Sequence, residues 1–355
     1  MMAAASKTGG RSYVLISNEN ENGYQVYDSA DLISGTFTKI ANVATSSTNY
    51  GGYKPIWLRG TNQGLYPWRS PIPAWGVTVS NFNDDGTVSS SFNYDHAVND
   101  SIYSQTSNGR SVSDGSRFYM LAGSLHLYTP SSTTLSYDLS LNLGNYNAVS
   151  HFDVSADDQY ISWSSASSNR INVATFNSST GDTLDIRNNT TTLDIGDHAI
   201  NPVETDIVAA GERGSSLQPR AFIFRRTSNG LSQVTSATIV PGSTVPSTRC
   251  LRWSPDGTHF AITHNYVNYF GVLHCMSIFS WNSSTNTVSK TGQLNIGSDG
   301  TLQCEWLDDN YLAVIKETNY NNFIVVNATN KSAPYASATI SDNKRYYAMN
   351  ITEGL

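Results

Sequence analysis

A unit of about 50 residues recurs along the chain and limits the possible folds more than any other feature of the sequence. Its clearest copy has an alternating run over residues 249–253, then the turn Ser254-Pro255-Asp256-Gly257, then a second apolar run. Proline presets φ, aspartate bonds nearby backbone, and glycine supplies the positive φ that such a turn needs. Two more runs, residues 273–281 and 287–294, follow in the same copy. Each unit therefore predicts four short strands joined by tight turns.

The repeat continues in both directions from this copy. First strands are predicted to begin near residues 53, 101, 148, 198, 249 and 301. Four strands per copy at this period are typical of the blades of a β-propeller. The ends of the chain supply three strands in front (residues 12–17, 24–27 and 36–40) and one at the tail (residues 344–350). Together these form one more blade, and sharing it would remove exposed sheet edges.

The sequence therefore predicts an all-β chain, with few helices because no ten-residue stretch has a helical apolar period. The prediction is a single β-propeller domain over residues 1–355, with seven four-stranded blades and a ring closed by N- and C-terminal strands that share one blade. Residues 1–11 are predicted to be an N-terminal extension. The predicted blades cover about residues 12–43 plus 344–350, then 53–92, 101–141, 148–190, 198–238, 249–294 and 301–340. Six or eight blades are the alternatives.

The turn Ser254-Pro255-Asp256-Gly257 after a strand that ends in Trp253, and polar turns such as residues 177–181, resemble tryptophan-aspartate-repeat and TolB-like propellers. The resemblance covers most of the chain and implies the architecture. The Gly-His and Trp-Asp dipeptides of the first family are missing, and their nearest matches are Asp197-His198 and Trp281-Asn282. The side-chain network of that family is therefore not carried over.

Composition excludes several classes of partner. Charged residues make up 14% of the chain and the net charge is −7, so the clustered cations that nucleic acids require are missing. No apolar stretch is long enough to span a membrane or to form a signal peptide. The sequence thus predicts a soluble protein without membrane insertion. The three cysteines (Cys250, Cys275 and Cys304) are predicted to be buried free thiols.

Motifs that carry catalysis are missing from the sequence, so no catalytic residue, cofactor or metal site is predicted. His151 and His198 open predicted first strands and are expected near the loop face, but a metal would need a third ligand. Structural hydrogen bonding is the favoured interpretation of both. The carboxylate pairs (Asp84-Asp85, Asp157-Asp158 and Asp308-Asp309) fall at hairpin turns, where aspartate is favoured for backbone reasons.

The strongest interaction signal is aromatic and lies between predicted second and third strands, in connections that a propeller presents on one face. Tyr, Trp and Arg gathered on one face are typical of binding hot spots and of surfaces that stack on sugars. The alternative is that the rings cover the core. The candidate interaction surface comprises Tyr66, Trp68, Arg69, Trp75, Tyr266, Tyr269, Phe270 and Tyr320.

These features favour a non-catalytic interaction protein, and turns such as residues 27–31 resemble repeats of bacteriophage structural proteins. The leading hypothesis is a virion component, a capsid decoration or tail-associated protein, located in the virion with capsid or tail proteins as partners. A carbohydrate-binding propeller or glycan-active enzyme that binds a host-surface glycan is the alternative. An intracellular interaction scaffold is the third.

Overall fold

The computed structural model describes residues 11–18, 23–44, 54–69, 75–96, 109–122, 124–131, 134–141, 143, 151–164, 169–177, 180, 182–191, 194–213, 219–239, 247–269, 272–294, 301–317, 321–342 and 344–352. These residues form seven four-stranded antiparallel sheets and one short helix. The chain is therefore an all-β protein with the seven-bladed propeller fold, as the repeat predicts. It divides into two compact units, which are described separately.

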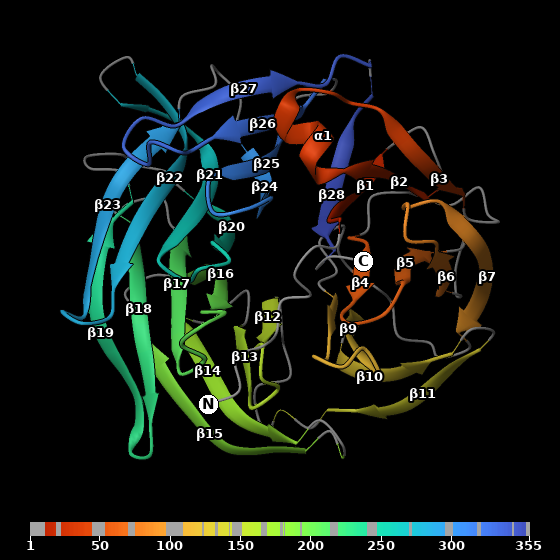
Figure 1. Cartoon of the computed structure of the whole chain (residues 1–355). Coiled ribbons are helices and arrows are strands. Elements are labelled where there is room, and N and C mark those ends of the chain that lie inside the picture. Colours follow the sequence, from red (N-terminus) through yellow and green to blue (C-terminus); the bar gives the residue numbers. More distant parts are fainter. Residues whose placement is uncertain are drawn as a thin grey trace. The chain divides into compact units, whose positions relative to one another are not determined.

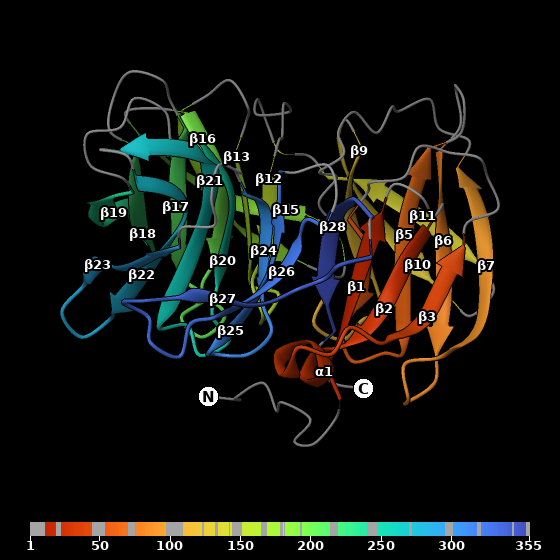
Figure 2. The ribbon, with the colours of Figure 1, turned by 90° about the horizontal axis from the view of Figure 1, so that it is seen from above.

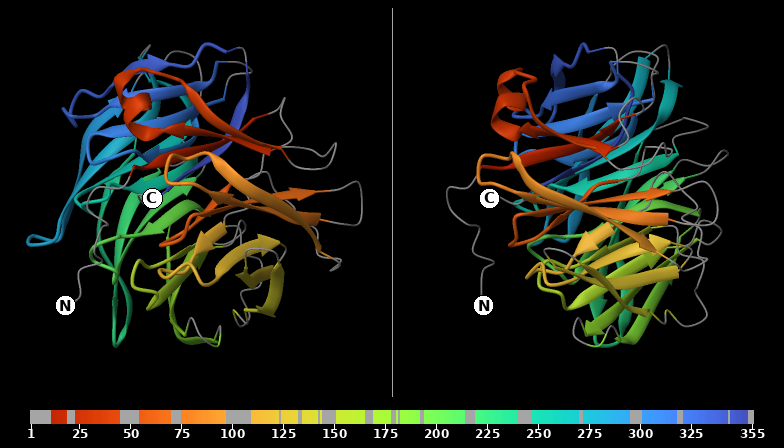
Figure 3. Two further views of the ribbon diagram at one scale, coloured as in Figure 1. Left: turned by 45° about the vertical axis from the view of Figure 1, so that its right-hand side comes forward. Right: turned by 90° about the vertical axis from the view of Figure 1, so that its right-hand side faces the viewer.

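Unit 1 contains residues 1–143, 319–322 and 340–355, and holds three sheets (Figures 1 and 3). The first is β28 (Tyr346–Ile351), β1 (Tyr13–Asn18), β2 (Gly23–Asp28) and β3 (Lys39–Ala44). The second is β4 (Ile56–Leu58), β5 (Gln63–Arg69), β6 (Trp75–Phe82) and β7 (Val88–His96). The third is β8 (Gly109–Ser111), β9 (Phe118–Ala122), β10 (Ser124–Pro130) and β11 (Leu135–Ser140).

Unit 2 contains residues 144–318 and 323–339, and holds four sheets. The first two are β12 (His151–Val154), β13 (Tyr160–Ser164), β14 (Arg170–Asn177) and β15 (Asp182–Thr190), then β16 (Asp194–Ile200), β17 (Ile207–Arg213), β18 (Arg220–Thr227) and β19 (Gly230–Thr238). The last two are β20 (Thr248–Trp253), β21 (His259–Tyr269), β22 (Val272–Asn282) and β23 (Thr287–Leu294), then β24 (Thr301–Trp306), β25 (Tyr311–Lys316), β26 (Phe323–Asn327) and β27 (Tyr335–Thr339).

The closing pair of strands is confirmed. The C-terminal strand β28 pairs antiparallel with β1, with Leu15 opposite Asn350 and Ile16 opposite Met349. The side chain of Asn322 holds β28 from the other side: its amide donates to the Tyr346 carbonyl at 2.8 Å, and its oxygen accepts from the Tyr346 amide at 2.8 Å. Asn322 is fully buried, so these bonds are sheltered from water.

Apolar clusters lie between neighbouring sheets within each unit. In unit 1, Leu15, Tyr24, Leu65, Tyr66 and Phe118 belong to one buried cluster that spans all three sheets. In unit 2, separate clusters join each sheet to the next. Burial of alternate side chains on both faces of a strand accounts for the short apolar runs of the repeat.

A tryptophan at the end of a first strand ties neighbouring sheets together. The Trp253 indole donates to the Ala199 carbonyl at 3.0 Å, and the Trp306 indole donates to the Arg252 carbonyl at 3.0 Å. Both bonds run from one first strand to the previous one. A repeated inter-sheet bond of this kind explains why two copies of the repeat place tryptophan at the same point.

The expected turn at residues 27–31 was wrong. Residues 27–31 do not form a turn but the start of helix α1 (Ser29–Ser34), which lies at the end of the first sheet (Figure 2). Asp28 caps the helix by accepting from the Ala30 amide at 2.8 Å, and Gly35 ends it at φ 84°. Six residues are too few to show a helical period, which is why the sequence pattern missed α1.

The bounds of several strands also differ from the sequence prediction. The strand predicted from residue 198 begins at Asp194, and its register shifts between Ile195 and Asp197. Such an irregularity breaks the alternating pattern. Gly196 marks this point, since a Cβ there would lie 2.4 Å from the Thr248 carbonyl oxygen. Residues 101–108 and the N-terminal extension to residue 10 lie outside the described residues.

Candidate functional site

The first strands of the four sheets in unit 2 form a continuous row. Strand β12 contacts β16, β16 contacts β20, and β20 contacts β24 (Figure 1). We call this set the first-strand row. Its positions alternate between apolar side chains, which enter the clusters between sheets, and polar ones. Six of its titratable side chains are called the charge cluster: His151, Asp153, Asp197, His198, Arg252 and Glu305.

Arg252 links two carboxylates from neighbouring strands. Its Nη1 lies 3.1 Å from Asp197 Oδ2 on β16, and its Nε lies 3.0 Å from Glu305 Oε1 on β24. The exposed fractions of the three side chains are 10% for Arg252, 4% for Asp197 and 14% for Glu305. Ion pairs this deeply buried require good geometry, because both partners lose their hydration.

Backbone groups complete the coordination of the carboxylates. Asp197 Oδ2 also accepts from the Leu251 amide at 2.9 Å, and its Oδ1 accepts from the His198 amide at 2.9 Å. Asp153 Oδ2 accepts from the Ile200 amide at 2.9 Å. Each bond from Asp153 and Asp197 Oδ2 reaches the next strand of the row. The carboxylates therefore fix the spacing of the first strands as well as holding charge.

The electrostatic environment keeps these groups ionised. Burial alone would raise the pKa of Asp197, but Arg252, His151 and His198 outweigh it, so the Asp197 pKa lies below its ordinary value. Burial alone would lower the pKa of Arg252, but ionisation of Cys250 and the carboxylates of Glu305 and Asp197 raise it well above its ordinary value. The pair therefore remains a carboxylate and a guanidinium at neutral pH.

Two imidazoles flank the ion pair. His198 is 1% exposed, and its ring nitrogens fall outside hydrogen-bonding geometry with the described residues. Burial lowers its pKa to about 4, so the ring is neutral at pH 7. His151 is partly exposed at the start of β12. Burial also lowers the pKa of His151, the Asp197 charge opposes this, and the Arg252 and Arg213 charges add to it.

For His198 the expectation of structural hydrogen bonding stays a prediction: neither ring nitrogen meets the geometry of a hydrogen bond to a described residue, but the Ser162 backbone acts on the ring as a hydrogen-bond partner and raises its pKa. The structure does bring His151 and His198 together on neighbouring first strands around Asp197. Within the described ranges, no group of three or more His, Cys, Asp or Glu side chains is placed to hold a metal ion. The arrangement offers a partly exposed neutral base, a buried carboxylate and nearby cations, a combination suited to general base catalysis.

The buried imidazole predicts a loss of stability in mild acid. The pKa of His198 is about 4 in the folded chain against 6.5 for an ordinary histidine, so below pH 6.5 the unfolded chain binds a proton that the folded chain does not. The free energy of unfolding should fall by roughly 2 kcal/mol between pH 7 and pH 5 from this group. The loss continues until the pH passes about 4. Urea unfolding at both pH values measures it.

The variant His198→Gln should show a smaller pH dependence than the wild-type protein. His259→Gln is the matched control, since the His259 ring is partly exposed and bonds Thr258 Oγ1 at 2.8 Å. That control should keep most of the pH dependence. Identical pH dependence in the wild-type and His198→Gln proteins would show that His198 is not the responsible group.

The aromatic surface predicted from sequence is only partly described. Tyr66 is 1% exposed and packs against Tyr24 with ring centroids 5.7 Å apart, so it is a core residue and its inclusion in a surface was wrong. Its strand alternates, and Tyr66 points into the cluster of unit 1. Trp68, Arg69, Trp75, Tyr266 and Tyr269 lie on β5, β6 and β21, but their side chains are outside the described residues, as are Phe270 and Tyr320. The remaining surface stays a prediction.

The acidic pairs serve the turns, as predicted. Asp85 Oδ1 accepts from the Thr87 amide at 3.0 Å, Asp157 Oδ1 from the Gln159 amide at 3.1 Å, and Asp308 Oδ1 from the Asn310 amide at 2.7 Å. The three cysteines are buried and free, also as predicted. Turn formation therefore accounts for the acidic pairs and core packing for the cysteines, and neither explanation needs a catalytic or metal-binding role.

The charge cluster carried a signal that the sequence analysis did not use. Arg252 is a buried cation between the apolar residues Leu251 and Trp253. Asp197 precedes it by 55 residues and Glu305 follows it by 53, which is one repeat on each side. Opposite charges one repeat apart at equivalent strands indicate an ion pair between neighbouring blades. To recognise such a pair in a sequence, one must know which first strands are neighbours in the fold.

Comparison with known proteins shows the fold. No family model matches the chain, and no curated protein matches it. Among solved structures, a Lactobacillus plantarum protein matches with a TM-score of 0.70 at 9% identity, covering 96% of this chain and 99% of the other. A Bacteroides uniformis protein assigned as a 6-phosphogluconolactonase matches at 0.67 and 11%, covering 97% and 100%. The Pseudomonas aeruginosa periplasmic gluconolactonase matches at 0.67 and 10%, covering 96% and 99%.

These comparisons correct the functional prediction. The hypothesis of a non-catalytic virion component is contradicted, because the similar structures include lactonase-type propellers and give no support to a phage role or to a virion location. The prediction that the chain is not an enzyme is contradicted on the same finding. No helix in the described part of the chain is long and apolar enough to cross a membrane. The resemblance to propeller repeats is confirmed for the architecture: the chain has the fold of seven-bladed β-propellers.

Proposed function

We propose that the chain hydrolyses a lactone, the cyclic ester of a sugar acid, at the charge cluster of unit 2. The observation that carries this proposal is the partly exposed neutral imidazole of His151 next to the buried Asp197–Arg252 pair. Lactone hydrolysis needs a base to activate water and positive charge to stabilise the oxyanion. Both kinds of group are present around His151.

The reaction assigns a role to each group. A water molecule adds to the lactone carbonyl carbon and gives its proton to the His151 imidazole. The Asp197 carboxylate stabilises the imidazolium that forms, and the positive charge of Arg213 stabilises the carbonyl oxygen as it becomes an oxyanion. When the tetrahedral intermediate collapses, the ester C–O bond breaks, and the former ring oxygen leaves as an alcohol after it receives the proton that His151 took from the water. The product is the open-chain sugar acid.

The comparisons support the same class of reaction. One similar structure is named as a periplasmic gluconolactonase and another is assigned as a 6-phosphogluconolactonase. Identity to both is about 10%, so the likeness by itself speaks for the fold. The proposal therefore rests on His151, Asp197 and Arg252, which lie on the row of first strands, and on Arg213, which ends β17.

The test is hydrolysis of D-glucono-1,5-lactone, followed by titration of released acid at slightly acid pH, where spontaneous hydrolysis is slow. His151→Gln should lower kcat/KM by about 100-fold or more, which is the usual contribution of a general base. The acid limb of the kcat/KM profile should fall below pH 6.5, because the His151 pKa is lowered from that value.

His259→Gln serves as the control, since His259 lies on β21 beside a turn and is not in the charge cluster. It should leave kcat/KM unchanged. A wild-type protein that does not exceed the spontaneous rate, or a His151→Gln variant with full activity, would refute the proposal.

A further inference from the structure

Cys250 and Cys304 face each other across the boundary between two sheets of unit 2. Cys250 lies on β20 and Cys304 on β24, the neighbouring first strand (Figure 1). Both side chains belong to one buried apolar cluster, together with side chains of both sheets such as Met276 and Val314. The Cys250 thiol donates to the Cys304 carbonyl at 3.6 Å, and the two thiols act on one another as hydrogen-bond partners.

The residues beside the two cysteines hold β20 and β24 in this arrangement. The Trp306 indole donates to the Arg252 carbonyl at 3.0 Å, and Arg252 Nε lies 3.0 Å from Glu305 Oε1. A disulfide forms only between cysteines whose side chains are already close and point toward each other. Because the two strands are fixed together on both sides of the thiols, the folded chain meets this requirement without moving distant segments.

The two thiols differ in how readily they ionise. Burial alone would raise the pKa of Cys250, but the hydrogen bond with the Cys304 thiol and the charge of Arg252 lower it below its ordinary value. The hydrogen bond with Cys250, together with burial, raises the pKa of Cys304 well above its ordinary value. Cys250 therefore ionises first, and a thiolate is the form of cysteine that reacts with oxidants.

The third thiol is bonded differently. Cys275 on β22 donates to the Leu294 carbonyl at 3.3 Å, and Leu294 lies on β23 of the same sheet. Cys275 is buried and free, as Cys250 and Cys304 are. It therefore serves as an internal reference for a buried thiol that bonds backbone within its own sheet.

We propose that Cys250 and Cys304 form a modification site, a dithiol that hydrogen peroxide oxidises to a disulfide between β20 and β24. The Cys250 thiolate attacks one peroxide oxygen, the O–O bond breaks, and Cys250 becomes a sulfenic acid while the other oxygen leaves as hydroxide and takes a proton. The Cys304 sulfur then attacks the Cys250 sulfur, the S–O bond breaks, and the departing oxygen leaves as water with the Cys304 proton. Both thiols are oxidised, and the peroxide is reduced to two molecules of water.

This disulfide would connect two sheets of unit 2 by a covalent bond. The two cysteines are 54 residues apart in sequence. A cross-link that closes a loop of this length stabilises a protein mainly by restricting its unfolded chain, so the oxidised protein should melt about 5 °C above the reduced protein. The inference is independent of the proposed hydrolysis, in which neither thiol takes part.

The test is oxidation of the full-length native protein with hydrogen peroxide. The protein is then unfolded, its remaining thiols are alkylated with N-ethylmaleimide, and its peptides are mapped by mass spectrometry. The expected product is a pair of peptides linked through Cys250 and Cys304, with Cys275 alkylated. Dithiothreitol should reverse both the link and the rise in melting temperature.

Single variants identify the thiols that react. Cys250→Ala and Cys304→Ala should each prevent the cross-link, and alanine suits the apolar surroundings of both positions. In Cys304→Ala, the sulfenic acid of Cys250 should accumulate and be trapped by dimedone. Cys275→Ala is the matched control and should form the disulfide as the wild-type protein does.

The peptide map of the wild-type protein decides the case even if a variant does not fold. The proposal is overturned if peroxide leaves Cys250 and Cys304 open to alkylation, or oxidises them without joining them. A link from either cysteine to Cys275 or to a second molecule of the protein would overturn it as well.

Discussion

Removal of residues 344–355 is expected to prevent the chain from folding stably. This deletion takes away β28, which is the first strand of its sheet and pairs along the length of β1. Tyr346, Ala348 and Met349 on this strand are at most 4% exposed. Burial of large side chains contributes about 1.5–3 kcal/mol each, and the edge of β1 would be left without partners. The sum is comparable to the whole stability of a typical domain, about 5–15 kcal/mol.

A shorter deletion provides the control for this experiment. Loss of residues 353–355 leaves Thr352, whose hydroxyl accepts from the Tyr13 amide at 2.7 Å, so that protein should melt as the full chain does. Addition of a synthetic peptide of residues 344–355 to the long deletion should restore part of the melting transition. Thermal melting followed by circular dichroism measures all three. An unchanged midpoint in the long deletion would disprove closure of the first sheet by β28.

Replacement of Arg252 by methionine is expected to lower the free energy of unfolding by about 3–5 kcal/mol, the usual cost of removing one partner from a buried ion pair. The variant Arg252→Met leaves the carboxylates of Asp197 and Glu305 buried without a cation. The control is Arg225, a partly exposed arginine that pairs with Glu204 at 3.5 Å and with Asp206 at 3.4 Å. There, Arg225→Met should cost at most about 1 kcal/mol, because water screens the charges.

A compensated variant tests the electrostatic cause. Adding Asp197→Asn and Glu305→Gln to Arg252→Met removes the uncompensated charges. In the wild-type protein the Leu251 amide donates to an Asp197 carboxylate oxygen, and the asparagine side chain keeps one oxygen that can accept this bond. This triple variant should recover more than half of the lost stability in urea unfolding. If it is as unstable as Arg252→Met, packing of the arginine side chain is the cause of the loss.

Much of the fold follows from short-range chemistry. The turn at Ser254–Gly257 was predicted from its residues, and in the structure Ser254 Oγ donates to Asp256 Oδ1 at 2.6 Å. The same bond joins Ser155 to Asp157 at 2.6 Å. Repeated turns of this kind fix the number and order of the strands. Six complete repeats leave one C-terminal strand unassigned, and this strand was predicted to join the first sheet. Turn chemistry depends on neighbours in the sequence, so a sequence can reveal it.

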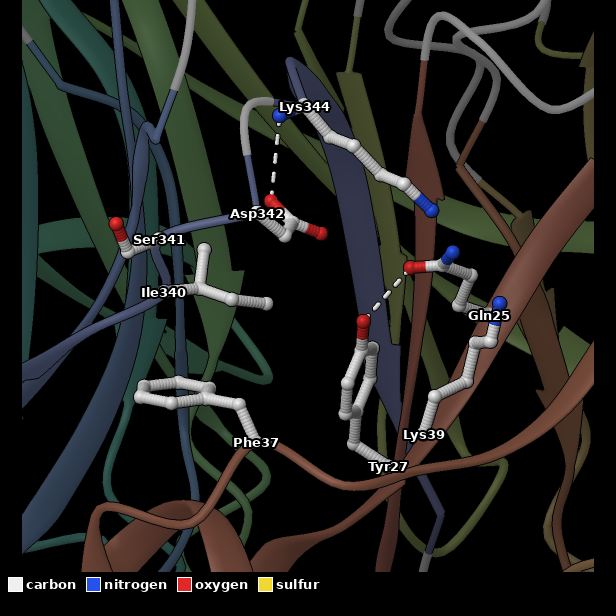
Figure 4. A pocket seen from close by; sticks show the side chains of 8 residues that line it. All are labelled: Gln25, Tyr27, Phe37, Lys39, Ile340, Ser341, Asp342 and Lys344. Carbon is white, nitrogen blue, oxygen red and sulfur yellow. Dashed lines mark hydrogen bonds between the residues drawn. The ribbon is translucent and has the colours of Figure 1, made fainter.

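The candidate site depends on contacts that the sequence does not display. Polar residues of the first strands, such as Asp197 and Arg252, look unremarkable in their own segments. Their role appears only when β16, β20 and β24 lie side by side. The same holds for a pocket of unit 1, whose lining residues include Gln25, Lys39 and Lys344 from opposite ends of the chain (Figure 4).

The sequence alone thus determined the blades, their order and their closing strand, because turns and alternating strands are set by residues close together along the chain. Tertiary structure decided which polar side chains were buried, which of them met, and how far burial lowered the pKa values of His151 and His198. Those properties depend on desolvation and on charges one repeat away. A close partner in space lies about 50 residues away in sequence, beyond the reach of any local pattern.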